Sequence, residues 1–151
     1  MAEEDTRAAI TTFVAAHSTL TLATLSADGR PQAASLFFAS DANLRLYWVS
    51  GGSSRHCHNL ARHSHVAVTI QNETWSWTEI AGVQMEGQAT VVPAGPEWQT
   101  AWTLYQHKFL LVTDFQAEIS RSNFYVFTAD WMRLIDNSRG FGHKEEVGTR
   151  K

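Results

Sequence analysis

Runs in which apolar and polar positions alternate dominate the middle of the chain, and they predict β-strands. Leu20, Leu22 and Thr24 share one face of the first such run, as expected for a strand with one face in a core. Short polar turns at residues 26–29 and 40–43 then give the start of the chain a meander pattern. The runs rich in β-forming residues cover residues 19–25, 31–38, 44–50, 66–71, 80–92, 124–127 and 132–135.

Helical spacing replaces this alternation in a few places. Within residues 1–18, Asp5 or Thr6 is expected to cap an amphipathic helix that ends around His17. The residues expected on one side of it are Ala8, Ala9, Thr12, Phe13 and Ala16. Further helices are expected over residues 55–63, 97–108 and 114–122. The charged tail at residues 144–151 is expected to be loose.

Regularly spaced strands with a few flanking helices predict a mainly β fold. They favour a closed or nearly closed antiparallel barrel, because closure removes exposed strand edges, but alternation alone equally allows a sandwich. Gly82 and Gly87 interrupt the longest run and are expected at a bulge or a close approach of backbones. The chain has 151 residues, which fits one domain over residues 1–151.

Charge and cysteine content exclude several classes of protein. The net charge is -3 and no basic run occurs, which argues against a nucleic-acid partner. The N-terminus is acidic, and no apolar stretch is long enough for a membrane span, so a cytoplasmic protein is expected. Cys57 is the only cysteine, which excludes an internal disulfide and fits a reducing compartment.

A glycine- and serine-rich loop leads from the run at 44–50 into the helix expected at 55–63. Hydroxyls of Ser53 and Ser54, the guanidinium of Arg55 and the free N–H groups of a helix start are together suited to a phosphate. The alternative is a serine N-cap followed by an arginine that faces solvent.

Six short segments, in this order, resemble the FMN-binding split barrels related to pyridoxamine 5′-phosphate oxidase. They span residues 19–92, and each is only moderately specific alone. A closer likeness is to a small group of uncharacterised bacterial members with the C-terminal pattern D-N-x-x-G-F-G-x-K, which the run DNSRGFGHK at residues 136–144 matches. That run is either a polar turn after the last strand or a segment that reaches a dimer interface or active site. The six segments are TLATL (21–25), DGRPQ (28–32), LYWVS (46–50), SRH (54–56), VAV (66–68) and MEGQATV (85–91).

This resemblance decides between barrel and sandwich, and implies an antiparallel split β-barrel with flanking helices. It also implies a homodimer with FMN at the interface and an oxidoreductase activity on a small molecule. The flavin carries the redox chemistry in such proteins, so no catalytic residue is singled out. Trp48 has a second interpretation as a core aromatic. The alternatives are a deazaflavin (F420) reductase or a non-catalytic module for flavin or haem. The residues implied in cofactor binding are Ala34, Ser35, Leu36, Trp48, Val49, Ser50, Ser53, Ser54, Arg55, His56 and Gln88.

The sequence also departs from the family pattern. Ala34 and Ala39 stand near positions where the oxidases carry an arginine and a lysine, and His56 stands where a second phosphate-binding lysine is usual. Because a free histidine has a pKa of about 6.5, we expect a weaker hold on phosphate. The arrangement for oxidising vitamin B6 is absent. Residues 56, 58, 63 and 65 are histidines, but their spacing matches no familiar zinc site, and no metal is expected.

Overall fold

Antiparallel pairing joins all the strands of the described residues, 2–109 and 116–149, into a single sheet in this computed structural model. The helices are α1 (Glu3–Ala15), α2 (Arg55–Arg62), α3 (Pro96–Lys108) and α4 (Gln116–Ser120), with short 3-10 turns η1 (Trp77–Glu79) and η3 (Asn137–Arg139). The strands are β1 (Thr19–Leu25), β2 (Pro31–Phe37), β3 (Ala39–Ser40), β4 (Leu46–Ser50), β5 (His65–Gln71), β6 (Ala81–Val91), β7 (Asn123–Asp136) and β8 (Lys144–Gly148).

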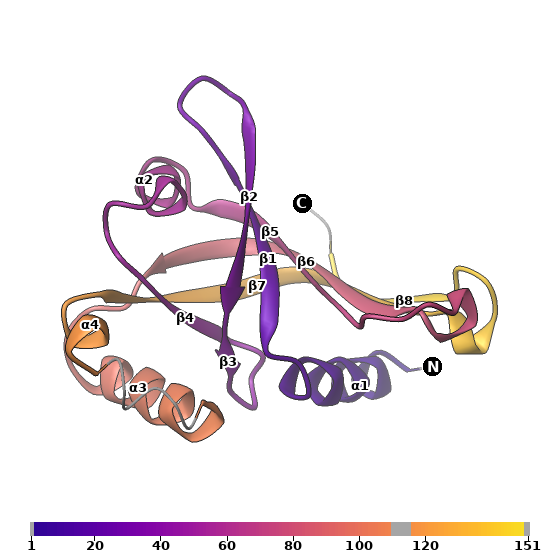
Figure 1. The fold of residues 1–151 in the computed structure, drawn as a ribbon. Coiled ribbons are helices and arrows are strands. Elements are labelled where there is room, and N and C mark those ends of the chain that lie inside the picture. Colours follow the sequence, from indigo (N-terminus) through magenta and orange to yellow (C-terminus); the bar gives the residue numbers. More distant parts are fainter. Residues whose placement is uncertain (1, 110–115, 150–151) are drawn as a thin grey trace.

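The sheet curls so that its two end strands are joined through the chain itself. The order of paired strands is β2-β1-β5-β6-β7-β4-β3, with β8 added on β7. β2 and β3 are the two ends of this path, yet only Phe38 separates them in the sequence. The curl is visible in Figure 1. The predicted antiparallel split barrel with flanking helices is therefore confirmed.

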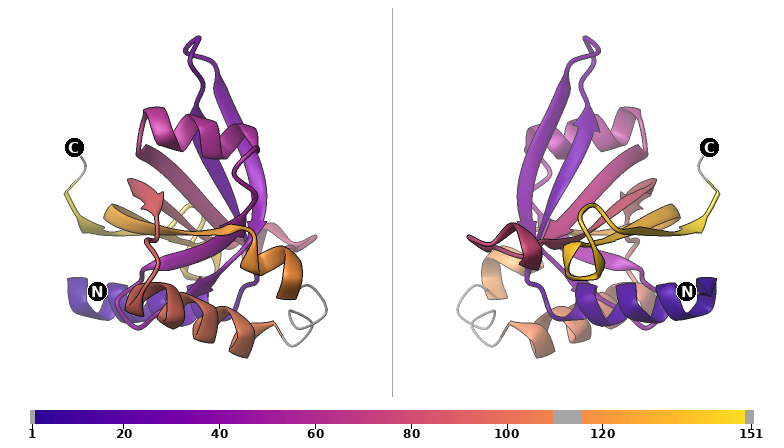
Figure 2. Two further views of the ribbon diagram at one scale, coloured as in Figure 1. Left: turned by 90° about the vertical axis from the view of Figure 1, so that its left-hand side faces the viewer. Right: turned by 90° about the vertical axis from the view of Figure 1, so that its right-hand side faces the viewer.

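Two hydrophobic clusters lie on either side of β4. Leu46 and Trp48 point into the barrel with Leu22, and α1 covers this cluster with Ile10 and Val14. In the second cluster, residues of α3 pack against the opposite face of β4 and against β7. Its buried members are Ala39, Tyr47, Val92, Ala101, Tyr105, Ile119 and Phe124. Figures 1 and 2 show α1 and α3 below the sheet and α2 above it, close to the projecting β1–β2 hairpin.

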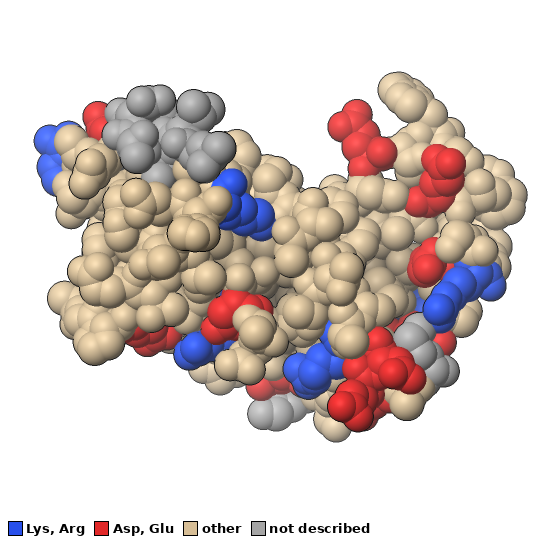
Figure 3. Space-filling view, turned by 90° about the horizontal axis from the view of Figure 1, so that it is seen from below, with Lys and Arg blue, Asp and Glu red and all other residues tan. Residues whose placement is uncertain are grey.

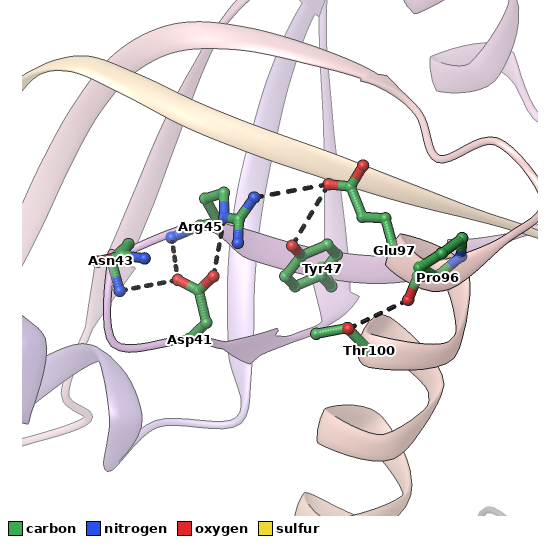
Figure 4. A network of polar contacts seen from close by, with 7 residues as sticks. All are labelled: Asp41, Asn43, Arg45, Tyr47, Pro96, Glu97 and Thr100. Atoms are coloured by element: carbon green, nitrogen blue, oxygen red, sulfur yellow. Dashed lines mark hydrogen bonds and ion pairs between the residues drawn. The ribbon is translucent and has the colours of Figure 1, made fainter.

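A polar network fastens α3 to the β3–β4 hairpin (Figure 4). Asp41 accepts hydrogen bonds from the backbone N–H groups of Asn43 and Arg45, both at 2.9 Å, and its second oxygen lies 2.8 Å from Arg45 Nε. Glu97 of α3 is 3.8 Å from Arg45 Nη1 and accepts a 3.5 Å hydrogen bond from the Tyr47 hydroxyl. These contacts fix the start of β4, the strand that leads to the candidate site.

The first helix differs from its prediction in start and in buried side. It begins at Glu3 after Ala2, and the Thr6 hydroxyl donates to the Ala2 carbonyl instead of capping the helix. Its buried residues are Thr6, Ile10 and Val14, spaced four apart. The predicted side was correct in part: Ala9 and Phe13 are half-buried and pack against the first cluster. The other predicted residues, Ala8, Thr12 and Ala16, are exposed, because the larger aliphatic side chains of Ile10 and Val14 fill the centre of the contact.

The region from 123 to 136 is one strand, not two. β7 pairs with β6 over residues 125–136. A β-bulge at Asp130, where the register shifts between the pairs Glu86↔Trp131 and Gly87↔Ala129, accounts for the break in alternation that suggested two strands. At Gly87 a Cβ atom would lie only 2.1 Å from the Thr128 carbonyl oxygen. The expectation of a close backbone approach at this glycine is confirmed.

The tail expected to be loose begins with a strand. β8 pairs with β7 in the register Met132↔Val147, and Val147 is buried. The Gly148 N–H also donates to Glu3 Oε1 at 3.2 Å, which ties β8 to α1. The end of the predicted tail, residues 150–151, lies outside the described residues. The same holds for residues 114–115 of the helix predicted over 114–122, whose centre corresponds to α4.

Figure 3 shows charges of both signs scattered over the face that carries α1 and α3, without a continuous basic area on that face. Of the described helices, none meets the length and hydropathy of a membrane span, and α1 and α3 have 13 residues each.

Candidate cofactor site

The first turn of α2 is presented at the end of β4 by a tight glycine-serine turn. The Ser54 N–H donates to the Gly51 carbonyl at 3.2 Å, and Ser54 takes an extended conformation as the residue before the helix. Its hydroxyl does not cap the helix but lies 3.2 Å from His56 Nε2. The first N–H groups of α2 therefore keep no helical acceptor and are available to an anion.

His56 is buried and forms a small cluster with two serines. Its Nε2 is 2.8 Å from the Ser50 hydroxyl and 3.2 Å from that of Ser54. Burial lowers the pKa of His56 below its ordinary value of 6.5, so the ring is neutral near pH 7. His56 thus orders Ser50 and Ser54 and supplies no positive charge at neutral pH, unlike the lysine usual in the family.

Arg55 lies against the β1–β2 turn. Its Nε and Nη2 atoms contact one acceptor, the Ser26 hydroxyl oxygen, at 3.0 and 2.7 Å. An arginine has five N–H donors, so the two hydrogens of Nη1 and the second hydrogen of Nη2 remain for a ligand at the end of the exposed guanidinium. Within the described part of the chain, no carboxylate forms an ion pair with Arg55.

Next to this loop, two strand edges have no strand partner over part of their length. β2 pairs only with β1, so the backbone of Ala34, Ser35 and Leu36 is open on its other side. β3 pairs only with Leu46 and Tyr47 of β4, which leaves the last three residues of β4 open on that side. β2 and β4 also contact each other. Open backbone edges at this position suit the polar rim of a flavin ring.

The side chains predicted at this point of β4 differ in accessibility. Trp48 is fully buried, its ring stacks on Tyr125 with centroids 6.3 Å apart, and its indole N–H has no hydrogen-bond partner among residues 2–109 and 116–149. Val49 packs against the second cluster, on the α3 side. The interpretation of Trp48 as a core aromatic is confirmed, and Trp48 and Val49 have only backbone groups to offer a ligand.

Gln88 and Ser53 are both exposed. The Gln88 amide nitrogen lies 3.4 Å from His65 Nε2, on the paired strand β5, and Gln88 makes no described contact with the first turn of α2. Ser53 lies on the loop just before α2. The structure therefore groups Ser50, Ser54 and His56 by direct contact, with Arg55 beside them.

Sequence reasoning missed a polar network that supports Arg55. The Asn59 side chain donates to Thr24 Oγ1 at 2.9 Å and to Ser26 Oγ at 3.2 Å, and the Thr24 hydroxyl donates to Gln32 Oε1 at 3.1 Å. Asn59 lies one helical turn after Arg55, and Thr24 lies on the buried face of β1. The sequence signal for this network was that polar residues stand at positions 24, 32 and 59.

Two hollows lie near α2. One, of about 420 Å³, runs between α2 and the ends of β6 and β7 and includes Cys57 and Tyr125; burial raises the pKa of Tyr125 to about 12. The other, of about 360 Å³, is on the outer face of the sheet and includes His63, His65 and Trp131. Neither includes Arg55. No group of three or more potential metal ligands occurs among the described residues.

Comparison with known proteins agrees with this fold. A family model described as pyridoxamine 5′-phosphate oxidase matches residues 6–136. No curated protein sequence gave a match. A heme binding protein from Mycobacterium smegmatis is similar in structure with a TM-score of 0.78 and 21% identity, over 98% of this chain and 58% of that one. This chain thus spans less than two thirds of that protein.

Two further solved structures cover more equal lengths. A conserved hypothetical protein from Mycobacterium tuberculosis has a TM-score of 0.76 and 22% identity, over 94% of this chain and 91% of its own. A FAD-binding protein from Mesorhizobium loti has a TM-score of 0.67 and 15% identity, over 83% and 88%. At these identities the likeness establishes a common fold.

Proposed function

Because the chain belongs to the pyridoxamine 5′-phosphate oxidase family, we propose that it binds FMN and acts as an FMN-dependent oxidoreductase on a small molecule. The observation that carries this proposal is the geometry of Arg55. Its guanidinium is held against Ser26 by two hydrogen bonds, and no described carboxylate pairs with it. Arg55 is also the first residue of α2, so the first N–H groups of the helix and the exposed Ser53 lie next to it in the chain. A phosphate monoester suits this combination of cation, hydroxyls and helix N-terminus.

The open edges of β2 and β4 are the proposed place for the isoalloxazine ring. The backbone of Ala34, Ser35 and Leu36 would meet its polar rim, while Ser50 stays ordered by His56. Bound FMN supplies electron and hydride transfer, so these residues have to bind and orient the ring. With Arg55 as the one cation assigned to the phosphate, we expect weaker binding than in relatives with additional cations.

We also propose that the protein works as a homodimer in the cytoplasm. Arg55 is exposed in the single chain, so the proposed phosphate position lies at the surface. A second copy covering the open edges of β2 and β4 would exclude water from the ring. Sedimentation velocity with and without FMN tests this, and a monomer under both conditions would contradict it.

Titration with FMN tests the proposed site. The purified protein should quench FMN fluorescence, and Arg55→Ala should weaken binding by about 1.5 to 3 kcal/mol, the range for a charge-assisted contact. Arg62→Ala is the matched control, since Arg62 is an exposed arginine at the other end of the same helix. Equal affinity of the Arg55 variant and the wild type would refute the phosphate assignment. A further assay measures whether the FMN-loaded protein oxidises NADH or NADPH, as an enzyme would and a flavin carrier would not.

A non-catalytic haem-binding module is the second candidate, favoured by one observation. His63 and His65 lie with ring centroids 5.5 Å apart in the hollow on the outer sheet face, where Ala23, Ala67 and Trp131 add apolar surface. Imidazole is a common axial ligand of haem iron. Haem titration followed by the Soret band, on wild type and a His63→Ala/His65→Ala variant, tests it. The alternative of a deazaflavin reductase is tested by measuring whether F420 displaces FMN from the Arg55 site.

A further inference from the structure

We propose that Ser26, on the turn after β1, is a positioning residue for the phosphate-binding guanidinium of Arg55. The inference rests on the proposed function, because it assigns a role at the same site. Ser26 is 29 residues away from Arg55 in the sequence, yet it is the acceptor for two of its N–H groups.

The contact selects one edge of the guanidinium. Arginine offers a side edge formed by Nε and one Nη, and an end formed by both Nη atoms. Ser26 Oγ occupies the side edge, at 3.0 Å from Nε and 2.7 Å from Nη2. The end of the fork is left for a bidentate contact with two phosphate oxygens.

Ser26 is itself fixed from the protein interior. Asn59 donates to Ser26 and to Thr24, and Thr24 donates to Gln32. Thr24 is 4% exposed and Asn59 is 5% exposed, whereas Arg55 is exposed, so the network runs from buried groups to a surface cation. Buried polar groups with satisfied bonds hold fixed positions. An exposed arginine would otherwise sample many rotamers, and fixing it beforehand lowers the entropy cost of binding an anion.

Parallel titrations with FMN and riboflavin test this role, because riboflavin has the same ring system and no phosphate. Ser26→Ala should weaken FMN binding roughly two- to tenfold, the effect of one hydrogen bond, and leave riboflavin affinity unchanged. Ser26→Cys, which keeps the shape but is a weak acceptor, should fall between, and Ser26→Thr should bind FMN as the wild type does. Ser18→Ala, an exposed serine at the opposite end of β1, is the control.

The outcomes are distinguishable. If Arg55→Ala weakens FMN binding while neither Ser26→Ala nor Ser26→Cys changes the ratio of FMN to riboflavin affinity, the positioning role is wrong and the phosphate site stands. Equal loss of both ligands would also overturn it, because it would show a general structural defect. If the wild type binds neither ligand, the proposed function fails and this inference fails with it.

Discussion

Replacing Gly87 with alanine should be among the most damaging single-methyl changes in this chain. An alanine Cβ would lie 2.1 Å from the Thr128 carbonyl oxygen and 2.8 Å from the Ala129 Cα. Both are backbone atoms of β7, so no side chain can rotate away to make room. Relief requires β6 and β7 to separate at the bulge, where the longest strand pairing of the sheet passes.

The expected cost exceeds about 3 kcal/mol, the upper end of ordinary overpacking in a core, since the clash is with backbone. For a domain of this size each kcal/mol lowers Tm by roughly 2–4 °C, so Tm should fall by about 6 °C or more. Gly51→Ala is the matched control. Its Cβ would meet no atom within 4 Å, and its effect should stay within about 0.5 kcal/mol.

Thermal unfolding followed by circular dichroism compares the three proteins. A Gly87→Ala protein whose Tm lies within about 2 °C of the wild type would refute the reasoning, since it would show that β6 and β7 can part at this point at little cost. Aggregation during expression, together with a normal Gly51→Ala protein, would agree with the prediction.

Two further predictions concern buried basic groups. Because burial lowers the pKa of His56, the unfolded chain binds the proton more readily, so stability should be full above about pH 6.5 and fall as the pH drops below it. Urea unfolding at several pH values measures the free energy of unfolding of the wild type and of His56→Gln. In the wild type it should fall by at most about 1.4 kcal/mol per pH unit, and in the variant this fall should be absent. Burial likewise lowers the pKa of Lys108 from 10.5 to about 8; its ammonium lies 4.0 Å from the Phe38 ring centroid. Stability should therefore rise with pH between these two values, and a Lys108→Met variant with the same rise would contradict this cause.

The local parts of the fold were predictable from the sequence. β1 has the predicted bounds, and α2 begins at Arg55 as the serine-rich loop indicated. Such features depend on neighbouring residues only: alternation for the strand, turn residues and capping types for the helix. The family, confirmed by the match over residues 6–136, was likewise visible in the order of short segments.

Features that depend on a distant partner were not predictable. β8 carries charged residues, and it is ordered because β7 offers residues 131–135 as a pairing edge. β7 was divided in two because the extra residue of its own bulge, Asp130, interrupts the alternation, and only the pairing with β6 on both sides of it makes the strand continuous. The contact between Ser26 and Arg55 depends on how the β1–β2 hairpin packs on α2, which no local pattern of residues specifies.

Closure of the sheet at Phe38 has a consequence for any ligand at the open edges of β2 and β4. One residue links the two end strands, so their adjoining ends cannot move apart by more than the length of that link. The backbone groups at the Phe37 end of β2 thus stay close to the β3–β4 hairpin whether or not a molecule is bound. A cofactor that binds at this end would meet backbone groups that are already held in place, which lowers the entropy cost of its binding.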